Sequence, residues 1–73
     1  MIESVTALKT LAESVPGASL RRRERQIVEL RAGLNGSDQH SLREIARKLR
    51  VSKDRVRQIQ NRAIEKLEQE MRG

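Results

Sequence analysis

The sequence has no cysteine, no aromatic residue, one proline and no long apolar run. Without cysteine there is no disulfide, no thiolate metal site and no cysteine nucleophile. The longest apolar runs are only a few residues long, so we find neither a candidate transmembrane helix nor the apolar core of a signal peptide. The core must therefore be built from leucine, isoleucine, valine and alanine, which favours packed helices.

Residues for catalysis are also scarce. The one histidine, His40, has no second ligand near it in the sequence, and no spacing resembles a catalytic triad, a metal site or a phosphate-binding loop. We therefore expect no enzyme, no cofactor, no metal and no small-molecule substrate. A length of 73 residues leaves room for one small domain, which we expect to span residues 1–73.

The charge is positive and unevenly distributed. The net charge is +6, with −1 in residues 1–19 and +7 in residues 20–73. A basic segment of this kind attracts polyanions, and nucleic acid is the commonest such partner. An ordinary solvated surface is the alternative. Because the chain has no aromatic ring to stack on unpaired bases, duplex DNA is favoured over single strands.

Apolar residues recur at helical spacing and predict an all-α, four-helix domain. A leading helix falls within residues 1–19 and stops at Pro16-Gly17. A second helix falls within residues 20–34; Ser19 is a candidate for its N-cap, and Gly33 for the left-handed residue at its end. Residues 35–40 read as a polar loop. The first apolar series consists of Ile2, Val5, Leu8, Ala12 and Val15.

Residues 41–69 have the layout of a helix-turn-helix. Ser41 and Glu44 form a capping box, which opens a helix over residues 42–49. After a three-residue break, Ser52 can cap a last helix that runs from Lys53 to about Glu70. Two short helices across such a tight turn predict a helix-turn-helix. We expect an apolar stripe of the last helix to face the core, and it consists of Val56, Ile59, Ala63 and Leu67. Ala46 is the small residue that lets the two helices cross closely, and Val51 is the apolar plug of the turn.

The first turns of a recognition helix reach base edges in the major groove. Here they carry polar side chains suited to that purpose: lysine donates to guanine, aspartate accepts from cytosine, and glutamine pairs with adenine. Asp54 has an alternative role as a charge that stabilises the helix N-terminus. Basic side chains nearby are placed to contact phosphates. The predicted base readers are Lys53, Asp54, Arg57 and Gln58, and the predicted backbone contacts include Arg47, Lys48, Arg55 and Arg62.

Two stretches of the chain resemble region 4, the C-terminal domain of bacterial sigma-70 family sigma factors. They are LRRRERQIVELRAGL and SLREIARKLRVSKDRVRQIQNRAIEKL, and the resemblance is strong over about residues 20–67. It implies a cytoplasmic, nucleoid-associated bacterial protein that reads the −35 promoter element and docks on the β-flap of RNA polymerase. An anti-sigma factor or an activator would be a further partner.

The resemblance also implies roles for individual residues. Lys53, Asp54 and Gln58 occupy the family's base-reading positions. Arg57, Arg31, Ser41 and Leu42 occupy positions that the family uses on the DNA backbone. The flap contact would fall on the aliphatic surface of the first two helices, where the sequence does not separate contact residues from core residues such as Leu8, Leu11, Ile27 and Leu30.

Three departures from the family pattern bear on these expectations. Arg21-Arg22 replace a hydroxyl cap and a proline, which leaves the start of the second helix uncertain. Ala32 stands where an aromatic residue is common, which predicts a thinner core. Lys53-Asp54 replace Arg-Glu, and because lysine lacks the fork of arginine we expect weaker discrimination at guanine.

Two other functions fit the same residues. A self-sufficient helix-turn-helix regulator would bind as a dimer at two half-sites. A protein-interaction module would bind chiefly the flap or an anti-sigma factor and would keep its partner in high salt, where DNA binding falls steeply. The chain also lacks the other domains of a sigma factor. Met1 fits both an excised domain and a stand-alone protein, and we expect the excised domain.

Overall fold

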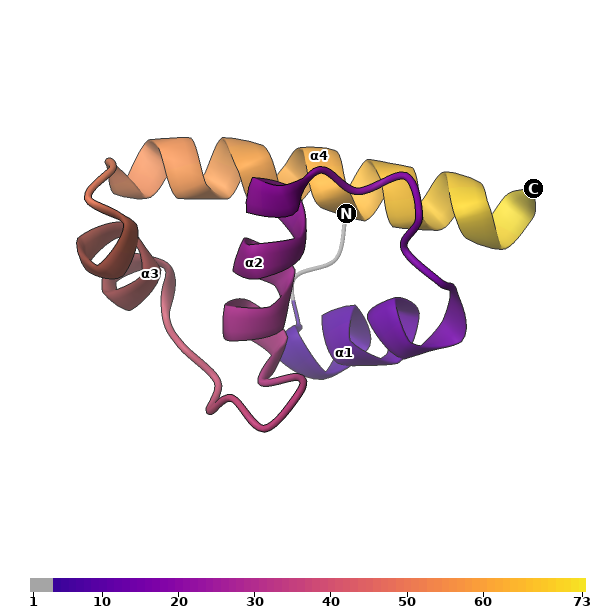
Figure 1. Ribbon diagram of the computed structural model, residues 1–73, viewed down its shortest axis with the longest axis horizontal. Helices are drawn as coiled ribbons and strands as arrows, with labels where there is room; N and C mark the ends of the chain where they lie inside the picture. Colours follow the sequence, from indigo (N-terminus) through magenta and orange to yellow (C-terminus); the bar gives the residue numbers. More distant parts are fainter. Residues whose placement is uncertain (1–3) are drawn as a thin grey trace.

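The structure is a computed structural model that describes residues 4–73, and it consists of four helices. In chain order they are α1 (Val5–Ser14), α2 (Arg22–Ala32), α3 (Leu42–Leu49) and α4 (Lys53–Arg72). The long α4 runs across the molecule, α2 meets it near its middle, and α1 and α3 lie on either side of α2 (Figure 1). The described residues contain no strand, so the predicted all-α fold with a C-terminal helix-turn-helix is confirmed.

Three helices differ in extent from the sequence expectation. The leading helix is limited to Val5–Ser14, and Ile2, expected on its apolar face, lies outside the described residues. The second helix begins at Arg22 and ends at Ala32, so it is shorter than the interval 20–34 at both ends. The last helix continues past Glu70 to Arg72.

The capping predictions for α3 and α4 are confirmed. The Glu44 amide donates to Ser41 Oγ at 3.1 Å, and the Ser41 amide donates to Glu44 Oε1 at 2.8 Å. The Arg55 amide donates to Ser52 Oγ at 3.0 Å. These bonds satisfy amides that the first turn of a helix leaves without partners.

The expected cap of α2 is wrong. Ser19 lies outside the helix, and the residue that precedes α2 is Arg21. The Arg21 amide donates to Glu24 Oε1 at 2.7 Å, which is the carboxylate half of a capping box. Ser19 instead donates from both its amide and its hydroxyl to Glu70, at the far end of α4. The glycine expected at the other end of α2 is confirmed, since Gly33 has φ 72°.

The core consists of two aliphatic clusters on opposite sides of α2. One joins α1, α2 and the C-terminal half of α4, and the other joins α2, α3 and the N-terminal half of α4. Ala46 is buried in the second cluster, and Val51 in the turn packs against it. The helix-turn-helix therefore packs against α2 through this second cluster. The first cluster contains Leu8, Leu11, Val28, Ala32, Ala63, Ile64 and Leu67; the second contains Ile27, Leu30, Ile45, Ala46 and Val56.

None of the helices in residues 4–73 combines the length and the apolar character needed to cross a membrane.

Candidate nucleic-acid interface

The packing of α4 leaves one face of this helix free over its whole length. Val56, Ala63 and Leu67 are buried as predicted, and Ile59 is half-buried. Ile64 is also buried, at 3% exposure, although its position lies at the edge of the predicted stripe. It packs in the cluster that includes α1. In the first two turns of α4, Val56 is buried and Ile59 packs against the second cluster. The exposed side chains that remain free to meet a ligand there are Lys53, Asp54, Arg55, Arg57 and Gln58.

All four predicted base readers lie on this free part of α4. Lys53, Asp54, Arg57 and Gln58 are exposed. Arg57 Nη2 lies 3.5 Å from Asp54 Oδ1, and the two side chains remain 56% and 80% exposed. An ion pair this exposed contributes little to stability, so both groups stay available to other partners.

The residues predicted to contact the DNA backbone fall into two groups. Arg47, Lys48, Arg55 and Arg62 are exposed on α3 and α4. The other three lie where α2 ends and α3 begins and are partly occupied by contacts within the protein. Arg31 donates from Nη1 to the His40 carbonyl at 3.1 Å, the Ser41 hydroxyl accepts from the Glu44 amide, and Leu42 is half-buried against the second cluster.

A basic groove runs between the start of α2 and the first half of α4. It has a volume of about 440 Å³. Among residues 4–73 no carboxylate lies within ion-pairing distance of its four arginine side chains. Sequence reasoning placed Arg55, Gln58 and Arg62 on an interface but missed Arg21 and Arg23. The groove is lined by Arg21, Arg23, Glu24, Arg55, Gln58, Ile59 and Arg62.

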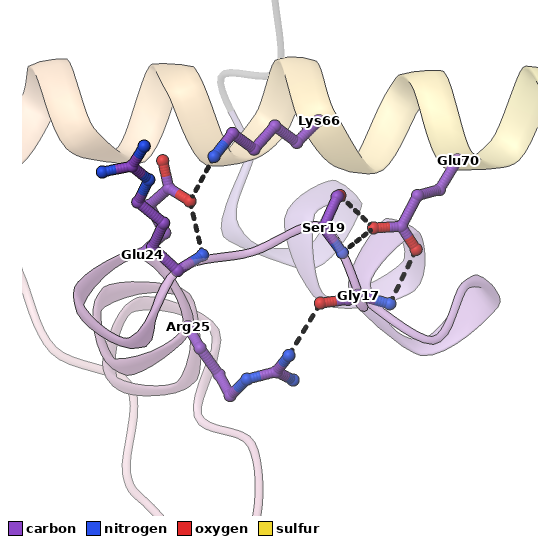
Figure 2. Close-up of polar contacts among 7 residues, drawn as sticks. Gly17, Ser19, Glu24, Arg25, Lys66 and Glu70 are labelled. Atoms are coloured by element: carbon purple, nitrogen blue, oxygen red, sulfur yellow. Dashed lines mark hydrogen bonds and ion pairs between the residues drawn. The ribbon is translucent and has the colours of Figure 1, made fainter.

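The one acidic residue of this groove is neutralised from α4. Glu24 is 4% exposed, and its Oε1 accepts from Lys66 Nζ at 2.8 Å as well as from the Arg21 amide (Figure 2). Burial raises the pKa of this carboxyl, but the bonds and charges of Lys66 and Arg21 outweigh burial and hold the pKa below its ordinary value. Glu24 therefore stays ionised and paired, and the surface of the groove is dominated by arginine.

A second polar contact fastens the segment between α1 and α2 to the end of α4. Glu70 accepts from the amides of Gly17 at 2.8 Å and Ser19 at 3.0 Å, and from the Ser19 hydroxyl (Figure 2). The hydroxyl and amide of Ser19 are the main reason that the pKa of Glu70 lies below its ordinary value. Arg25 Nη2 donates to the Gly17 carbonyl at 2.7 Å.

This fastened segment forms one wall of a hollow of about 250 Å³ between α1, α2 and α4. Its lining is mixed, with aliphatic side chains beside Glu13, Arg25 and Glu29. The aliphatic part consists of Ala12, Pro16, Leu20, Val28, Leu34 and Leu67.

No group of three histidine, cysteine or acidic side chains in residues 4–73 is arranged to hold a metal ion. His40 serves the loop before α3: its amide donates to the Leu30 carbonyl at 2.9 Å, and its Nδ1 lies 2.7 Å from the Asp38 carbonyl. The histidine thus fixes backbone near Arg31.

Comparison with known proteins links this arrangement to one family. The sequence model of the family "Sigma-70, region 4" matches residues 18–69 of this chain. RNA polymerase sigma factor SigA4 of Synechococcus elongatus is 50% identical over 50 residues, which cover 68% of this chain and 16% of that protein. RNA polymerase sigma-C factor of Nostoc sp. is 46% identical over 55 residues, which cover 75% of this chain and 13% of that protein.

A chloroplast protein is similar as well. RNA polymerase sigma factor sigF of Arabidopsis thaliana is 46% identical over 52 residues, covering 71% of this chain and 10% of that protein. The chain thus spans 10–16% of the length of these three relatives. No solved structure matches it.

Proposed function

The chain belongs to the sigma-70 region 4 family, and on that basis we propose that it is the promoter-reading domain of a bacterial sigma factor. In this proposal residues 1–73 form one domain, and this domain acts in the cytoplasm. The domain reads the −35 element in the major groove of duplex DNA and docks on the β-flap of RNA polymerase. It performs no catalysis.

The observation that carries the proposal is the orientation of α4. Its first two turns expose Lys53, Asp54, Arg57 and Gln58, while Val56 between them is 0% exposed and anchors the helix. A surface that only bound phosphates would gain nothing from an aspartate there, because a carboxylate repels phosphate. A cytosine amino group, by contrast, is a partner for which a carboxylate is suited. The mixture of charges therefore favours sequence readout.

Backbone contacts would come from both sides of the basic groove. Arg55 and Arg62 of α4 face it together with Arg23 of α2 and with Arg21, the residue that precedes α2. Arginine forms paired hydrogen bonds with phosphate oxygens, and such contacts give affinity without choosing a sequence. The proposed backbone set is completed by Arg31, Ser41, Leu42, Arg47 and Lys48.

Binding profiles over all single-base variants of a −35 duplex test the proposal. Asp54→Ala and Gln58→Ala should each change the preference at one position, whereas Arg62→Ala should weaken binding to every duplex alike and make it less dependent on salt. Indistinguishable profiles for the three variants would contradict base readout by α4. Low salt is needed, because the affinity of one domain is only part of that of a multi-domain protein.

The proposed flap contact must avoid side chains that already form the core. Leu8, Leu11, Ile27 and Leu30 are at most 9% exposed, so they are not available to a partner. The hollow between α1, α2 and α4 remains, where Ala12, Leu20 and Leu34 are half-buried. We therefore place the flap contact at this hollow.

Co-elution with a β-flap fragment tests this contact. Ala12→Glu puts a charge in the hollow without removing a core side chain, and we expect it to abolish co-elution in 0.5 M salt, in the range where DNA binding has become weak. Thr10→Glu, on an exposed position of the same helix, is the matched control and should still co-elute. Equal retention of both variants would contradict the assignment of the hollow.

A further inference from the structure

The paired carboxylate of Glu24 lies at the point where the two sides of the basic groove meet. Glu24 belongs to α2, and Lys66, its partner, belongs to α4, 42 positions later in the chain. The same Oε1 atom also accepts from the backbone of Arg21. One oxygen therefore connects α4, the first turn of α2 and the residue that precedes α2 (Figure 2).

The first turn of α2 has few other polar restraints. Its N-cap, Arg21, offers no side-chain acceptor to the amides of the first turn, and the bond from the Arg21 amide to Glu24 Oε1 is the carboxylate half of a capping box. Helix ends fray when their amides lack partners. Without the carboxylate, the turn that carries Arg21 and Arg23 would no longer be held against α4.

From these contacts we infer that Glu24 is a positioning residue for DNA binding: through Lys66 and the Arg21 amide it sets Arg21 and Arg23 opposite Arg55 and Arg62, so that the two rows of arginines contact the same stretch of DNA backbone. This inference rests on the proposed function. It assigns to a buried acid a role in binding a polyanion, which is the opposite of what its charge alone would predict.

Because Glu24 is inferred to strengthen DNA binding although it is negatively charged, two substitutions of this residue in the full chain can separate its charge from its hydrogen bonds. Glu24→Gln and Glu24→Met remove the same negative charge, but glutamine keeps a side-chain oxygen that accepts from Arg21 and Lys66, whereas methionine does not. If only charge mattered, both variants would bind DNA more tightly than the unaltered chain. If Glu24 positions the arginines, only the methionine variant should lose backbone contacts.

The measurement is the salt dependence of binding to a fluorescently labelled −35 duplex. The slope of log K against log salt changes by about 0.9 for each phosphate contact. We expect Glu24→Gln to keep the original slope and Glu24→Met to lose about 0.9 to 1.8 from it, corresponding to the contacts of Arg21 and Arg23. Base preference should stay unchanged in both variants. Glu13→Met, on an exposed position of α1, controls for loss of an acid elsewhere and should keep the slope.

Circular dichroism identifies a temperature at which all variants are fully folded, so that a difference in slope does not reflect unfolded protein. Equal slopes for Glu24→Gln and Glu24→Met at that temperature would overturn the inference. Should the methionine variant not fold, Lys66→Met removes the α4 partner instead and should lower the slope in the same way, whereas Lys66→Arg should restore it. The proposed function is tested separately by whether the unaltered chain binds the duplex at all.

Discussion

Replacing Lys66 by alanine should destabilise the fold far more at neutral pH than at acidic pH. Lys66→Ala removes the ammonium group that pairs with Glu24, whose side chain is 5% exposed, and leaves this carboxylate with the Arg21 amide as its remaining partner. Removing one member of a fully buried ion pair costs about 3–5 kcal/mol. Because the Lys66 side chain is itself 26% exposed, we expect a smaller loss, of about 2–3 kcal/mol at pH 7.

The pH dependence follows from the direction of each pKa shift. In the unaltered protein the pKa of Glu24 lies below its ordinary value of 4.5, so this group stabilises the fold above about pH 4.5 and loses that effect as the pH falls through the folded-state pKa. In Lys66→Ala the lowering effect of the ammonium group is lost while burial remains, so the pKa of Glu24 should rise above its value in the unaltered protein. The variant then lacks stabilisation that the unaltered protein gains as the pH rises through the pKa of Glu24. The stability difference between the two proteins should therefore shrink on acidification.

Urea unfolding followed by circular dichroism at 222 nm measures this difference, since the chain has no tryptophan or tyrosine to follow by fluorescence. A chain of this length is stabilised by roughly 4–11 kcal/mol in total, so a loss of 2–3 kcal/mol shifts the midpoint clearly. Lys48→Ala, at an exposed position, is the control and should stay within about 0.5 kcal/mol. A loss below about 0.5 kcal/mol for Lys66→Ala at pH 7, or an equal loss at pH 4, would refute the reasoning.

Three further substitutions are measured by the same urea titration. Arg50, the C-cap of α3, has φ 59° and ψ 44°, a left-handed conformation that costs a non-glycine residue about 1–2 kcal/mol. Arg50→Gly should therefore raise the free energy of unfolding by about 0.5–1 kcal/mol, and a decrease would contradict this account of the turn. Gly33→Ala should lower stability by roughly 1–3 kcal/mol, because φ is 72° and the new Cβ would lie 2.9 Å from Gln39 Cγ; an unchanged midpoint would show that the loop yields freely. Ile45→Ala, at 0% exposure, should cost about 2–5 kcal/mol, and a cost under 1 kcal/mol would mean that the second cluster collapses around the change.

The parts of the fold that the sequence predicted are those decided by neighbouring residues. Ser41, Glu44 and Ser52 cap their helices through bonds that span three positions, so their spacing alone carries the information. The start of α2 was not predictable in this way. It depends on Glu24, which is held by Lys66, and Ser19 is taken up by Glu70, 51 positions away. Contacts this distant leave no periodic signal in the chain.

The candidate site also has one part that neighbouring residues determine and another part that depends on distant contacts. Exposure of Asp54 and Gln58 follows from helical periodicity once Val56 is assigned to the core. The groove does not follow from periodicity, because it exists only where α2 is packed against α4, and no local pattern brings Arg23 and Arg55 to the same groove. The run of three arginines at residues 21–23 is the one local signal of it, and such a run does not say which helix it will face.

The contact between Asp54 and Arg57 bears on how α4 would distinguish one sequence from another. In the free protein the carboxylate lies 3.5 Å from the guanidinium group, at a site so exposed that the pair is worth only about 0.2–1 kcal/mol. A duplex that offers Asp54 a cytosine amino group replaces this pair at little cost. A duplex that offers it only acceptors leaves the carboxylate facing negative groups, while Arg57 still attracts phosphate. Discrimination would then come from repulsion of the wrong sequence as much as from attraction to the right one, which explains why an acid is useful in a helix whose neighbouring charges are basic.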